Sequence, residues 1–309
     1  MKTTNRDYLE EAGDFRRLCH FIIGHNKAIR TYSTWSLGRF VDWKYGLWES
    51  KTAVPDFCNR NAHLWYDGFD NLAGFVISEE GDAGLAIITQ AGYRFLFEEI
   101  LQWVLANWHE RGPGFSIEIA AEQQMELRVL EKYGFRRKAD FFRHTFDLTQ
   151  ELAPGKLLAE GFSIFDMATR PNFRAQRILR DEAFSGRSKV PEERLQREML
   201  FYNHGLQGPI YHPQTDLYVL ASDGQLVSGC EALIDAHNLE ADIERVCTHS
   251  KFRRRGLARA VIQECLFRLR EMGLQKAHIT GYSKEAVGLY AALGKSTQST
   301  CYIYETADP

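Results

Sequence analysis

Two spacings of apolar residues recur along the chain and predict short strands and helices. Residues 141–148 and 161–167 alternate between apolar and polar positions as strands do. Pro154 and Gly155 lie between these two segments and form a turn signal. We therefore expect a domain boundary after residue 150, which divides the 309 residues into nearly equal halves.

The second half predicts helices and strands in alternation. We expect helices over 172–184, 191–202, from 256 onward and over 284–293, and strands over 217–221, 226–234, 241–248, 275–279 and 301–304. The helix from residue 256 carries one apolar stripe at four-residue spacing, formed by Leu257, Val261, Cys265 and Leu269. This mixture of the two periods predicts an α/β (α+β) fold.

The two halves carry a faint repeat at a constant offset. Gly134 and Gly294 each follow a helical segment, and 294 − 134 gives an offset of 160 residues. The same offset aligns two further pairs without gaps, namely the strand-like segments 115–119 and 275–279 and the helical segments 95–108 and 255–268. Three elements in one register predict two tandem domains, residues 1–150 and 151–309, each a central mixed sheet flanked by helices.

Composition and charge narrow the classes of protein that this chain can be. The 38 Lys and Arg against 41 Asp and Glu give a formal net charge of −3, which argues against a nucleic-acid partner. No apolar run approaches the roughly 18 residues of a membrane span, and the N-terminus is polar, unlike a signal peptide. The six cysteines are scattered without a C-x-x-C pair, so we expect no metal site and a cytoplasmic protein.

A basic loop joins the expected strand 241–248 to the helix that begins near residue 256. The loop contains three consecutive arginines, Arg253, Arg254 and Arg255, and Arg259 follows in the helix. Gly256 and Ala258 leave the first helical turn without bulky side chains, so its unpaired N–H groups are accessible. The helix dipole adds positive potential, and a phosphate or pyrophosphate is therefore the expected occupant. The alternative is a solvated arginine face.

The spacing Arg253-x-x-Gly256-x-Ala258 resembles the Q/R-x-x-G-x-G/A signature of the GNAT superfamily of acyl-CoA-dependent N-acyltransferases. The preceding strand and the following amphipathic helix stand where that family places them. The resemblance covers residues 160–309, and the first half matches only in layout. It implies transfer of an acetyl group from acetyl-CoA to a primary amine by direct attack in a ternary complex.

A second motif lies downstream, in the same order as in the family. Residues 283–294 resemble its later short helix, which carries a tyrosine; here Ser283 replaces the common Asn, and Lys295 replaces the usual Phe. The resemblance makes Tyr290 the candidate acid for the departing thiolate, since a phenol with a pKa of about 10 is protonated at neutral pH. Packing of its ring in the core is the alternative.

The resemblance also implies a set of residues that bind acetyl-CoA. They are Val246, Cys247, Thr248, Arg253, Arg254, Arg255, Gly256, Leu257, Ala258, Arg259, Ser283 and Ala286. The first three act through backbone groups that hold the acetyl carbonyl and the pantetheine arm, much as an added strand is held.

The general base is less well defined by the sequence. Period-two alternation places Asp242, Glu244, Val246 and Thr248 on one face of their strand, and Ile243, Arg245 and Cys247 on the other. Asp242 or Glu244 is therefore a candidate to take the proton of the amine, directly or through water. A solvated face, or a salt bridge to the next strand, is the alternative.

A covalent route through Cys247 is the less favoured mechanism. It needs a thiolate, usually generated by a histidine within hydrogen-bond reach. His249 lies two residues further along the strand, which is too far for a good hydrogen bond, so a small buried thiol is the expected state.

The first half lacks the site residues at the same offset. Gly256, Ala258, Arg253, Tyr290, Asp242 and Glu244 fall on Leu96, Glu98, Tyr93, Leu130, Asp82 and Gly84. We therefore expect a degenerate first domain and a catalytic second one, which acts on a small-molecule or peptide amine. A non-catalytic acyl-CoA sensor is the alternative function. Because a fused repeat satisfies within one chain the contact of a dimer, a monomer is favoured over a homodimer.

We predict that acetyl-CoA binds at one site per chain, in the second half. Isothermal titration calorimetry should give a stoichiometry of about one, because only residues 253–259 keep the phosphate-binding pattern. Two equivalent sites would contradict this expectation.

Overall fold

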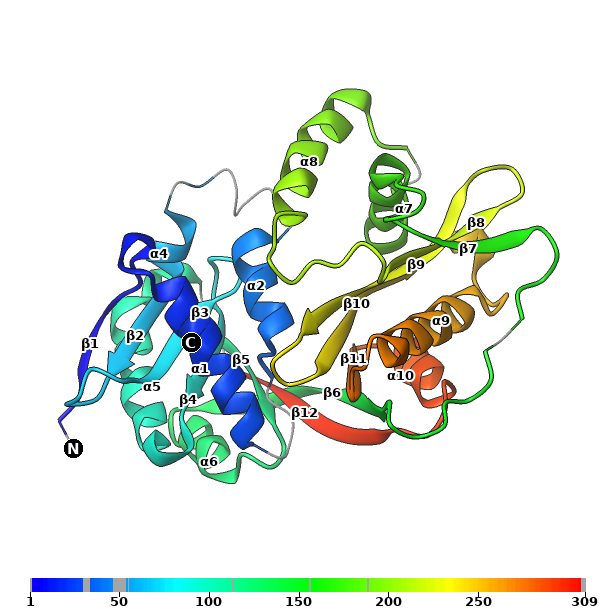
Figure 1. Cartoon of the computed structure of the whole chain (residues 1–309). Coiled ribbons are helices and arrows are strands. Elements are labelled where there is room, and N and C mark those ends of the chain that lie inside the picture. The colour runs from blue at the N-terminus through cyan, green and yellow to red at the C-terminus, as the bar shows by residue number, and fades with distance from the viewer. Residues whose placement is uncertain are drawn as a thin grey trace. The chain divides into compact units, whose positions relative to one another are not determined.

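The computed structural model describes residues 2–29, 34–46, 54, 56–112, 114–155, 157–187 and 189–306. The chain forms two compact units (Figure 1). Unit 1 comprises Met1–Lys44, Trp48–Phe141 and Ser299–Pro309, and unit 2 comprises Tyr45–Leu47 and Phe142–Gln298.

Unit 1 has a mixed sheet in the order β1-β2-β3-β4-β5-β12, in which only β4 and β5 are parallel. Its strands are β1 (Thr4–Asp7), β2 (Ala62–Tyr66), β3 (Leu72–Ser78), β4 (Gly84–Thr89), β5 (Ser116–Ala120) and β12 (Thr297–Thr306). Its helices are α1 (Asp14–Ala28), α2 (Leu37–Tyr45), α4 (Phe57–Asn61), α5 (Leu96–Asn107) and α6 (Gln124–Lys132), with 3-10 turns at Glu10–Ala12, Ala91–Tyr93 and His109–Arg111. Phe75 contacts α1, whereas its neighbour Val76 packs with α5, so helices cover both faces.

Unit 2 has the corresponding order, β7-β8-β9-β10-β11-β6, in which only β10 and β11 are parallel. Its strands are β7 (Phe162–Asp166), β8 (Asp216–Ala221), β9 (Leu226–Asp235), β10 (Glu240–Thr248), β11 (Lys276–Gly281) and the end of β6 (Phe135–Asp147). Its helices are α7 (Phe173–Ser185), α8 (Glu192–Gly205), α9 (Leu257–Glu271) and α10 (Lys284–Ala291), with a 3-10 turn at Ser250–Phe252. The predicted tandem α/β architecture is confirmed.

The last strand of each half of the sequence lies in the sheet of the other unit. Residues 142–147 of β6 pair with β11, and residues 301–305 of β12 pair with β5. The expected boundary after residue 150 therefore lies inside unit 2 as the contacts define it.

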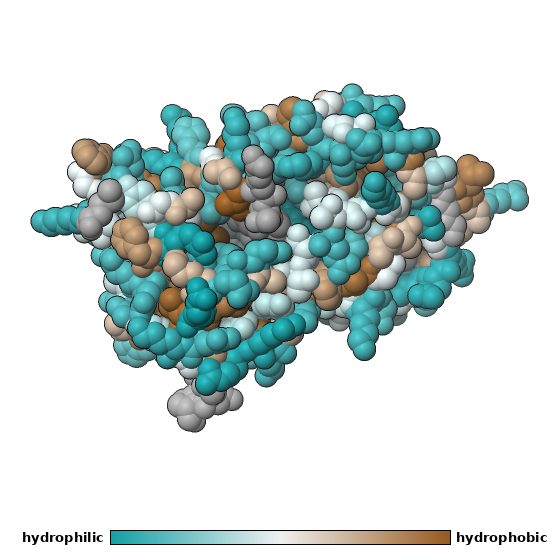
Figure 2. Space-filling view, turned by 90° about the horizontal axis from the view of Figure 1, so that it is seen from below, coloured by the Kyte–Doolittle hydropathy of each residue, from teal (hydrophilic) through white to brown (hydrophobic). Residues whose placement is uncertain are grey.

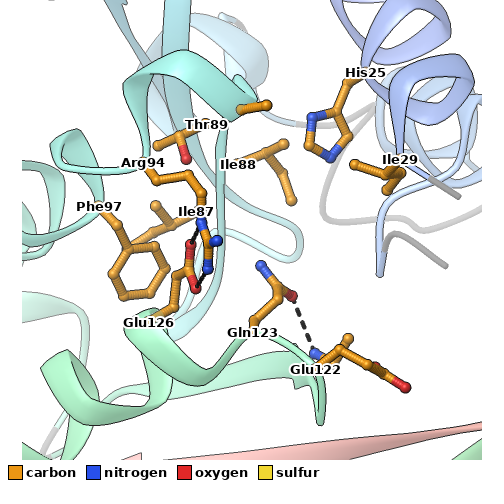
Figure 3. Close-up of a pocket in the computed structure, with 12 residues that line it drawn as sticks. His25, Ile29, Ile87, Ile88, Thr89, Arg94, Phe97, Glu122, Gln123 and Glu126 are labelled. Carbon is orange, nitrogen blue, oxygen red and sulfur yellow. Dashed lines mark hydrogen bonds and ion pairs between the residues drawn. The ribbon is translucent and has the colours of Figure 1, made fainter. Parts of the chain in front are cut away.

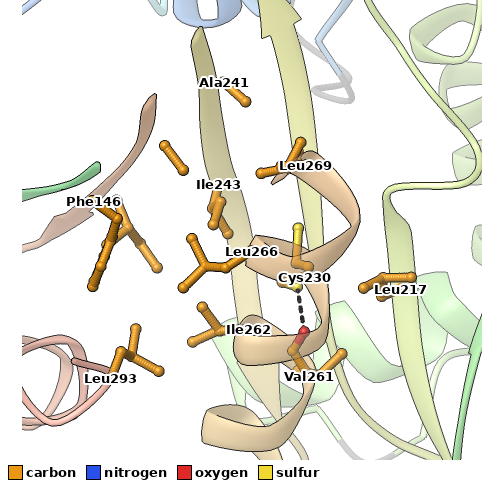
Figure 4. Close-up of a cluster of buried hydrophobic side chains, with 14 of the residues drawn as sticks. Phe146, Leu217, Cys230, Ala241, Ile243, Val261, Ile262, Leu266, Leu269 and Leu293 are labelled. Carbon is orange, nitrogen blue, oxygen red and sulfur yellow. Dashed lines mark hydrogen bonds between the residues drawn. The ribbon is translucent and has the colours of Figure 1, made fainter. Parts of the chain in front are cut away.

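The core of unit 2 lies between α9 and the sheet (Figure 4). All four residues of the predicted apolar stripe on α9 are buried there, so the stripe is confirmed. Cys230 of β9 donates a weak hydrogen bond from its Sγ to the carbonyl oxygen of Val261, at 3.7 Å. Phe146 of β6 is 2% exposed and packs in the same cluster. The exchanged strand is thus part of this core.

On the face drawn in Figure 2, hydrophilic residues predominate and hydrophobic ones are scattered in small groups. Within the residues that the structure describes, no helix is long and apolar enough to cross a membrane.

The pairing of β6 with β11 predicts how fragments of the chain behave. A fragment of residues 142–298 should unfold cooperatively, whereas one of 151–298 should not, because it lacks the strand and Phe146. Loss of a buried Phe side chain alone costs about 3–5 kcal/mol, against a total stability of about 5–15 kcal/mol. Thermal unfolding followed by circular dichroism compares the two, and equal midpoints would contradict the assignment of this strand to unit 2.

Candidate active site

In unit 2, two neighbouring parallel strands separate after a short pairing. β10 pairs with β11 over residues 240–242 alone, while its other edge stays paired with β9 as far as Thr248. A pocket of about 1080 Å³ opens beside the separated part of β10. The lining comes from α7 (Ala183, Phe184), β10 (Val246, Cys247, Thr248), the following loop (Phe252, Arg253, Arg254, Gly256), α9 (Leu257, Ala258, Arg259) and the α10 segment (Ser283, Lys284, Glu285, Ala286, Gly288, Leu289, Tyr290).

The pocket brings together nearly all the residues that the sequence assigned to acetyl-CoA. Arg255 is the exception among them, since it is exposed and absent from this lining. Its guanidinium carbon lies 5.0 Å from the centre of the Phe252 ring.

The loop before α9 is shaped by two residues in the left-handed region. Arg254 has φ 64° and Gly256 has φ 81°, a value that glycine adopts without a steric penalty. Gly256 is the N-cap of α9, and its carbonyl oxygen accepts the first helical hydrogen bond, from the N–H of Ala260 at 3.1 Å. The preceding N–H groups of the first turn have no partner within the helix.

Arg259, in the first turn of α9, also lines this pocket. Its buried Nε has no hydrogen-bond partner among the described residues. A helix N-terminus with convergent arginine donors is a binding site for phosphate groups, so the arrangement fits the phosphates of an acyl-CoA.

A β-bulge in β10 corrects the expected division of its faces. The register with β9 shifts between Glu244 and Cys247, and Arg245 adopts φ 51°. Ile243 and Val246 pack in the cluster beneath α9, whereas Cys247 packs with α7 residues on the other face. The prediction that Val246 faces away from Ile243, and Cys247 toward it, is therefore wrong, because strict alternation fails where a residue is inserted.

The bulge is anchored by charged side chains. Arg245 Nη1 donates to Glu231 Oε2 at 3.0 Å, and Arg180 of α7 donates to the same oxygen at 3.0 Å. At the shift, Arg245 and Val246 stand opposite a single residue of β9, as in a β-bulge.

The two candidate bases have different surroundings, and neither belongs to the pocket lining described above. Asp242 is 8% exposed and forms a buried ion pair with Arg143 of β6. The sequence left open a salt bridge to the next strand, whereas this one reaches β6, on the far side of the adjacent β11. Glu244 is exposed.

Tyr290 lies at the boundary of core and pocket. It is 6% exposed, packs in the core cluster of unit 2 and also lines the pocket. Burial raises the pKa of its hydroxyl, and the negative charge of Glu244 raises that pKa further. The side chain is therefore protonated at neutral pH, and the charge of Glu244 acts at Tyr290.

Cys247 does not have the environment of a nucleophile. Burial raises the pKa of its thiol to about 12, so the thiolate is scarce at neutral pH. The Nδ1 of His249 accepts the N–H of Lys251 at 3.3 Å and lies 3.6 Å from Glu182. The surroundings of both residues thus favour a buried thiol over the covalent route.

A family model described as Acetyltransferase (GNAT) family matches residues 176–294. This part of the chain is a GNAT domain. None of the curated proteins matches the sequence.

Solved structures extend the likeness of fold to the whole chain. A GCN5-related N-acetyltransferase from Sphaerobacter thermophilus is 17% identical, with a TM-score of 0.65 over 98% of this chain and 95% of that one. A tandem GNAT protein from the clavulanic acid biosynthesis pathway is 10% identical, with a TM-score of 0.69 over 100% and 99%. A GNAT-family acetyltransferase from Colwellia psychrerythraea is 13% identical, with a TM-score of 0.57 over 99% and 100%. The chain has the tandem GNAT fold.

The other GNAT-like unit contains a smaller pocket in the corresponding place (Figure 3). There β4 and β5 pair only through residues 84–85 and 116–117, and a pocket of about 210 Å³ opens beyond them. Arg94 and Glu126 both line it and stand 160 positions before Arg254 and Ala286.

These two side chains close the gap with an ion pair. Arg94 Nε donates to Glu126 Oε1 at 2.8 Å, and Arg94 Nη2 donates to Glu126 Oε2 at 2.6 Å. The pair joins the loop after β4 to the first turn of α6. In unit 2 the corresponding space between the loop and α10 belongs to the pocket.

Sequence reasoning missed the contribution of α7 to the pocket. Ala183 and Phe184 line it, and Phe184 is 62% exposed although it is large and apolar. The carbonyl oxygen of Ala183 accepts a hydrogen bond from Arg253 Nη2 at 3.3 Å. Ser185 and Gly186 in the sequence are a helix-end signal, but this contact spans 70 positions and no local pattern reports it.

A negative charge introduced at Ala258 tests whether the first turn of α9 binds phosphate. Ala258→Glu copies Glu98 of the first half, and it should weaken binding of coenzyme A by about ten- to a hundredfold, because like charges then oppose each other. Ala258→Gln is the matched control of similar size without charge. Calorimetry at low and high salt measures both variants, and the difference should shrink with salt. Equal affinities would show that no phosphate lies near residue 258.

Proposed function

We propose that the protein is an N-acetyltransferase that transfers the acetyl group of acetyl-CoA to a primary amine of a small molecule or peptide, by direct attack in a ternary complex. The catalytic half is residues 151–309, and residues 1–150 form a degenerate domain without a cofactor site. One observation carries the proposal: the phosphate-type loop, the separated edge of β10 and Tyr290 all meet in one pocket.

Each part of the pocket suits a different part of acetyl-CoA. The first-turn N–H groups of α9, with Arg254 and Arg259, would bind the pyrophosphate. Backbone groups of residues 246–248 would hold the pantetheine arm as an additional strand, because this edge of β10 is not paired with β11.

The reaction needs a base, an oxyanion donor and an acid. We assign the base to Glu244, which takes a proton from the substrate ammonium directly or through water, because Arg143 already holds the carboxylate of Asp242. The neutral amine attacks the thioester carbonyl, and the backbone N–H of Val246, which lines the pocket, stabilises the oxyanion. As the C–S bond breaks, the hydroxyl of Tyr290 gives its proton to the thiolate, and the second proton lost by the amide nitrogen returns to Tyr290 through water.

The raised pKa of Tyr290 is consistent with this role. Its proton is retained across neutral and moderately alkaline pH, so the acid form is available in the range where the amine loses its proton more readily. The charge of Glu244 favours the protonated phenol, which couples the two groups electrostatically.

Replacing only the hydroxyl tests the acid role. Tyr290→Phe keeps the packing of the ring, and it should lower kcat by about 10²- to 10⁴-fold, the typical contribution of a general acid. Affinity for acetyl-CoA should change little. Release of free thiol from acetyl-CoA with a panel of amines measures turnover, and calorimetry measures binding.

Three outcomes have different meanings. A kcat within about threefold of the wild type would exclude the acid role. Loss of affinity together with kcat would indicate that Tyr290 serves packing instead. Tight binding of acetyl-CoA without turnover of any amine by the wild type would favour an acyl-CoA sensor over an enzyme.

A further inference from the structure

A buried carboxylate joins the C-terminal turn of α7 to the loop between β10 and α9. Glu182 is 5% exposed. It accepts two hydrogen bonds from Ser250, which lies two residues after the end of β10 at Thr248. The backbone N–H of Ser250 lies 3.1 Å from Glu182 Oε2, and the Ser250 hydroxyl lies 2.5 Å from Oε1. One end of the loop is thus fixed to α7.

The other end of the loop is fixed to the same turn of α7. Arg253 donates from Nη2 to the carbonyl oxygen of Ala183, the residue after Glu182, at 3.3 Å. Its Nε donates to the carbonyl oxygen of Thr248, also at 3.3 Å. Arg253 therefore ties the loop to both α7 and the end of β10, and the loop is held at its first and last residues.

The position of this carboxylate is electrostatically unfavourable for an anion site. The hydrogen bonds from Ser250 hold the pKa of Glu182 below its usual value despite burial, so the side chain is negatively charged. A negative charge beside a phosphate-binding loop weakens phosphate binding by repulsion. The gain that offsets this cost is geometric, because the loop must hold its N–H groups and arginines in one arrangement before a ligand enters.

We propose that Glu182 is a positioning residue for acetyl-CoA binding, which acts through Ser250 to hold the phosphate loop in its binding conformation. This inference rests on the proposed function, since it assigns the phosphates of acetyl-CoA to that loop. The same contact also fixes the C-terminal end of α7, where Phe184 lines the pocket.

If Glu182 acts through the loop that binds phosphates, its effect should depend on whether the ligand contains phosphates. A ligand with phosphates should depend on Glu182, whereas pantetheine, which has no phosphate, should not. A general structural role for α7 would affect both ligands, because Ala183 and Phe184 line the pocket itself.

The experiment compares coenzyme A and pantetheine on three single variants and one double variant of the full chain. Glu182→Ala should raise the Kd for coenzyme A by about tenfold or more, through loss of two hydrogen bonds, and leave the Kd for pantetheine within about twofold. Glu182→Gln keeps an acceptor for the N–H of Ser250 and should restore most of the affinity. Ser250→Ala removes the hydroxyl donor, and its effect should be smaller when Glu182 is already Ala, as expected of two residues in one contact.

Calorimetry measures coenzyme A, ligand-observed NMR measures pantetheine, and circular dichroism confirms the fold of each variant. Unchanged or tighter binding of coenzyme A by Glu182→Ala would overturn the proposal, as would equal loss for both ligands. If Glu182→Ala fails to fold, the Gln and Ser250→Ala variants decide by the same criteria. Failure of the wild type to bind either ligand would instead contradict the proposed function.

Discussion

The site depends on one constraint, the early end of pairing between β10 and β11. Beyond residues 240–242 the facing edge of β10 has no strand beside it in the part of the chain that the structure describes. Backbone donors and acceptors need partners, so such an edge is stable only where water or a ligand reaches it. The core beneath α9 holds both strands, with Ile243 and Ile279 buried in one cluster. A ligand that pairs with the edge completes the sheet locally.

Unit 1 has the same separation of strands but lacks the basic loop that precedes α9 in unit 2. β4 and β5 also separate early, so the constraint on the strands is the same. The space is reduced by a bidentate ion pair between Arg94 and Glu126, and the first turn of α5 begins with buried Leu96. Glu98, in that turn, accepts a hydrogen bond from Lys132 at 2.6 Å. An internal anion therefore satisfies the arginine in unit 1.

Local patterns were sufficient for the elements, and insufficient for features that link distant residues. The stripe of α9 and the order of strand, basic loop and helix could be predicted, because each depends on spacing along one segment. The bulge could not, since period-two counting assumes that no residue is inserted, and Cys247 was assigned to the wrong face. The ion pair of Asp242 with Arg143 spans 99 positions, so no local signal announced it. The exchange of β6 and β12 between the two sheets could not be predicted for a related reason. Because the two halves are similar, the sequence does not indicate which of the two sheets each strand joins.

The three consecutive arginines illustrate why counting charges overestimates an anion site. On a regular helix or strand their directions would follow from the period, but Arg254 with φ 64° lies on an irregular loop. Arg253 uses its Nε and Nη2 to donate to the carbonyl oxygens of Thr248 and Ala183. Arg255 lies over the Phe252 ring and outside the pocket lining, which leaves Arg254 as the member that faces the pocket without such a tie in the described structure.

The local charge is further reduced by Glu182, whose carboxylate lies against the start of the same loop. A ligand therefore meets fewer available positive charges than the sequence contains. The side chains of Glu182 and Arg253, which do not add to the available positive charge, fix the loop at residues 250 and 253. Since a flexible loop loses conformational entropy when a ligand orders it, charges used to hold the loop lower that cost before binding. For the proposed ligand, we therefore expect affinity to depend on how well the loop is held as well as on how many cations it contains.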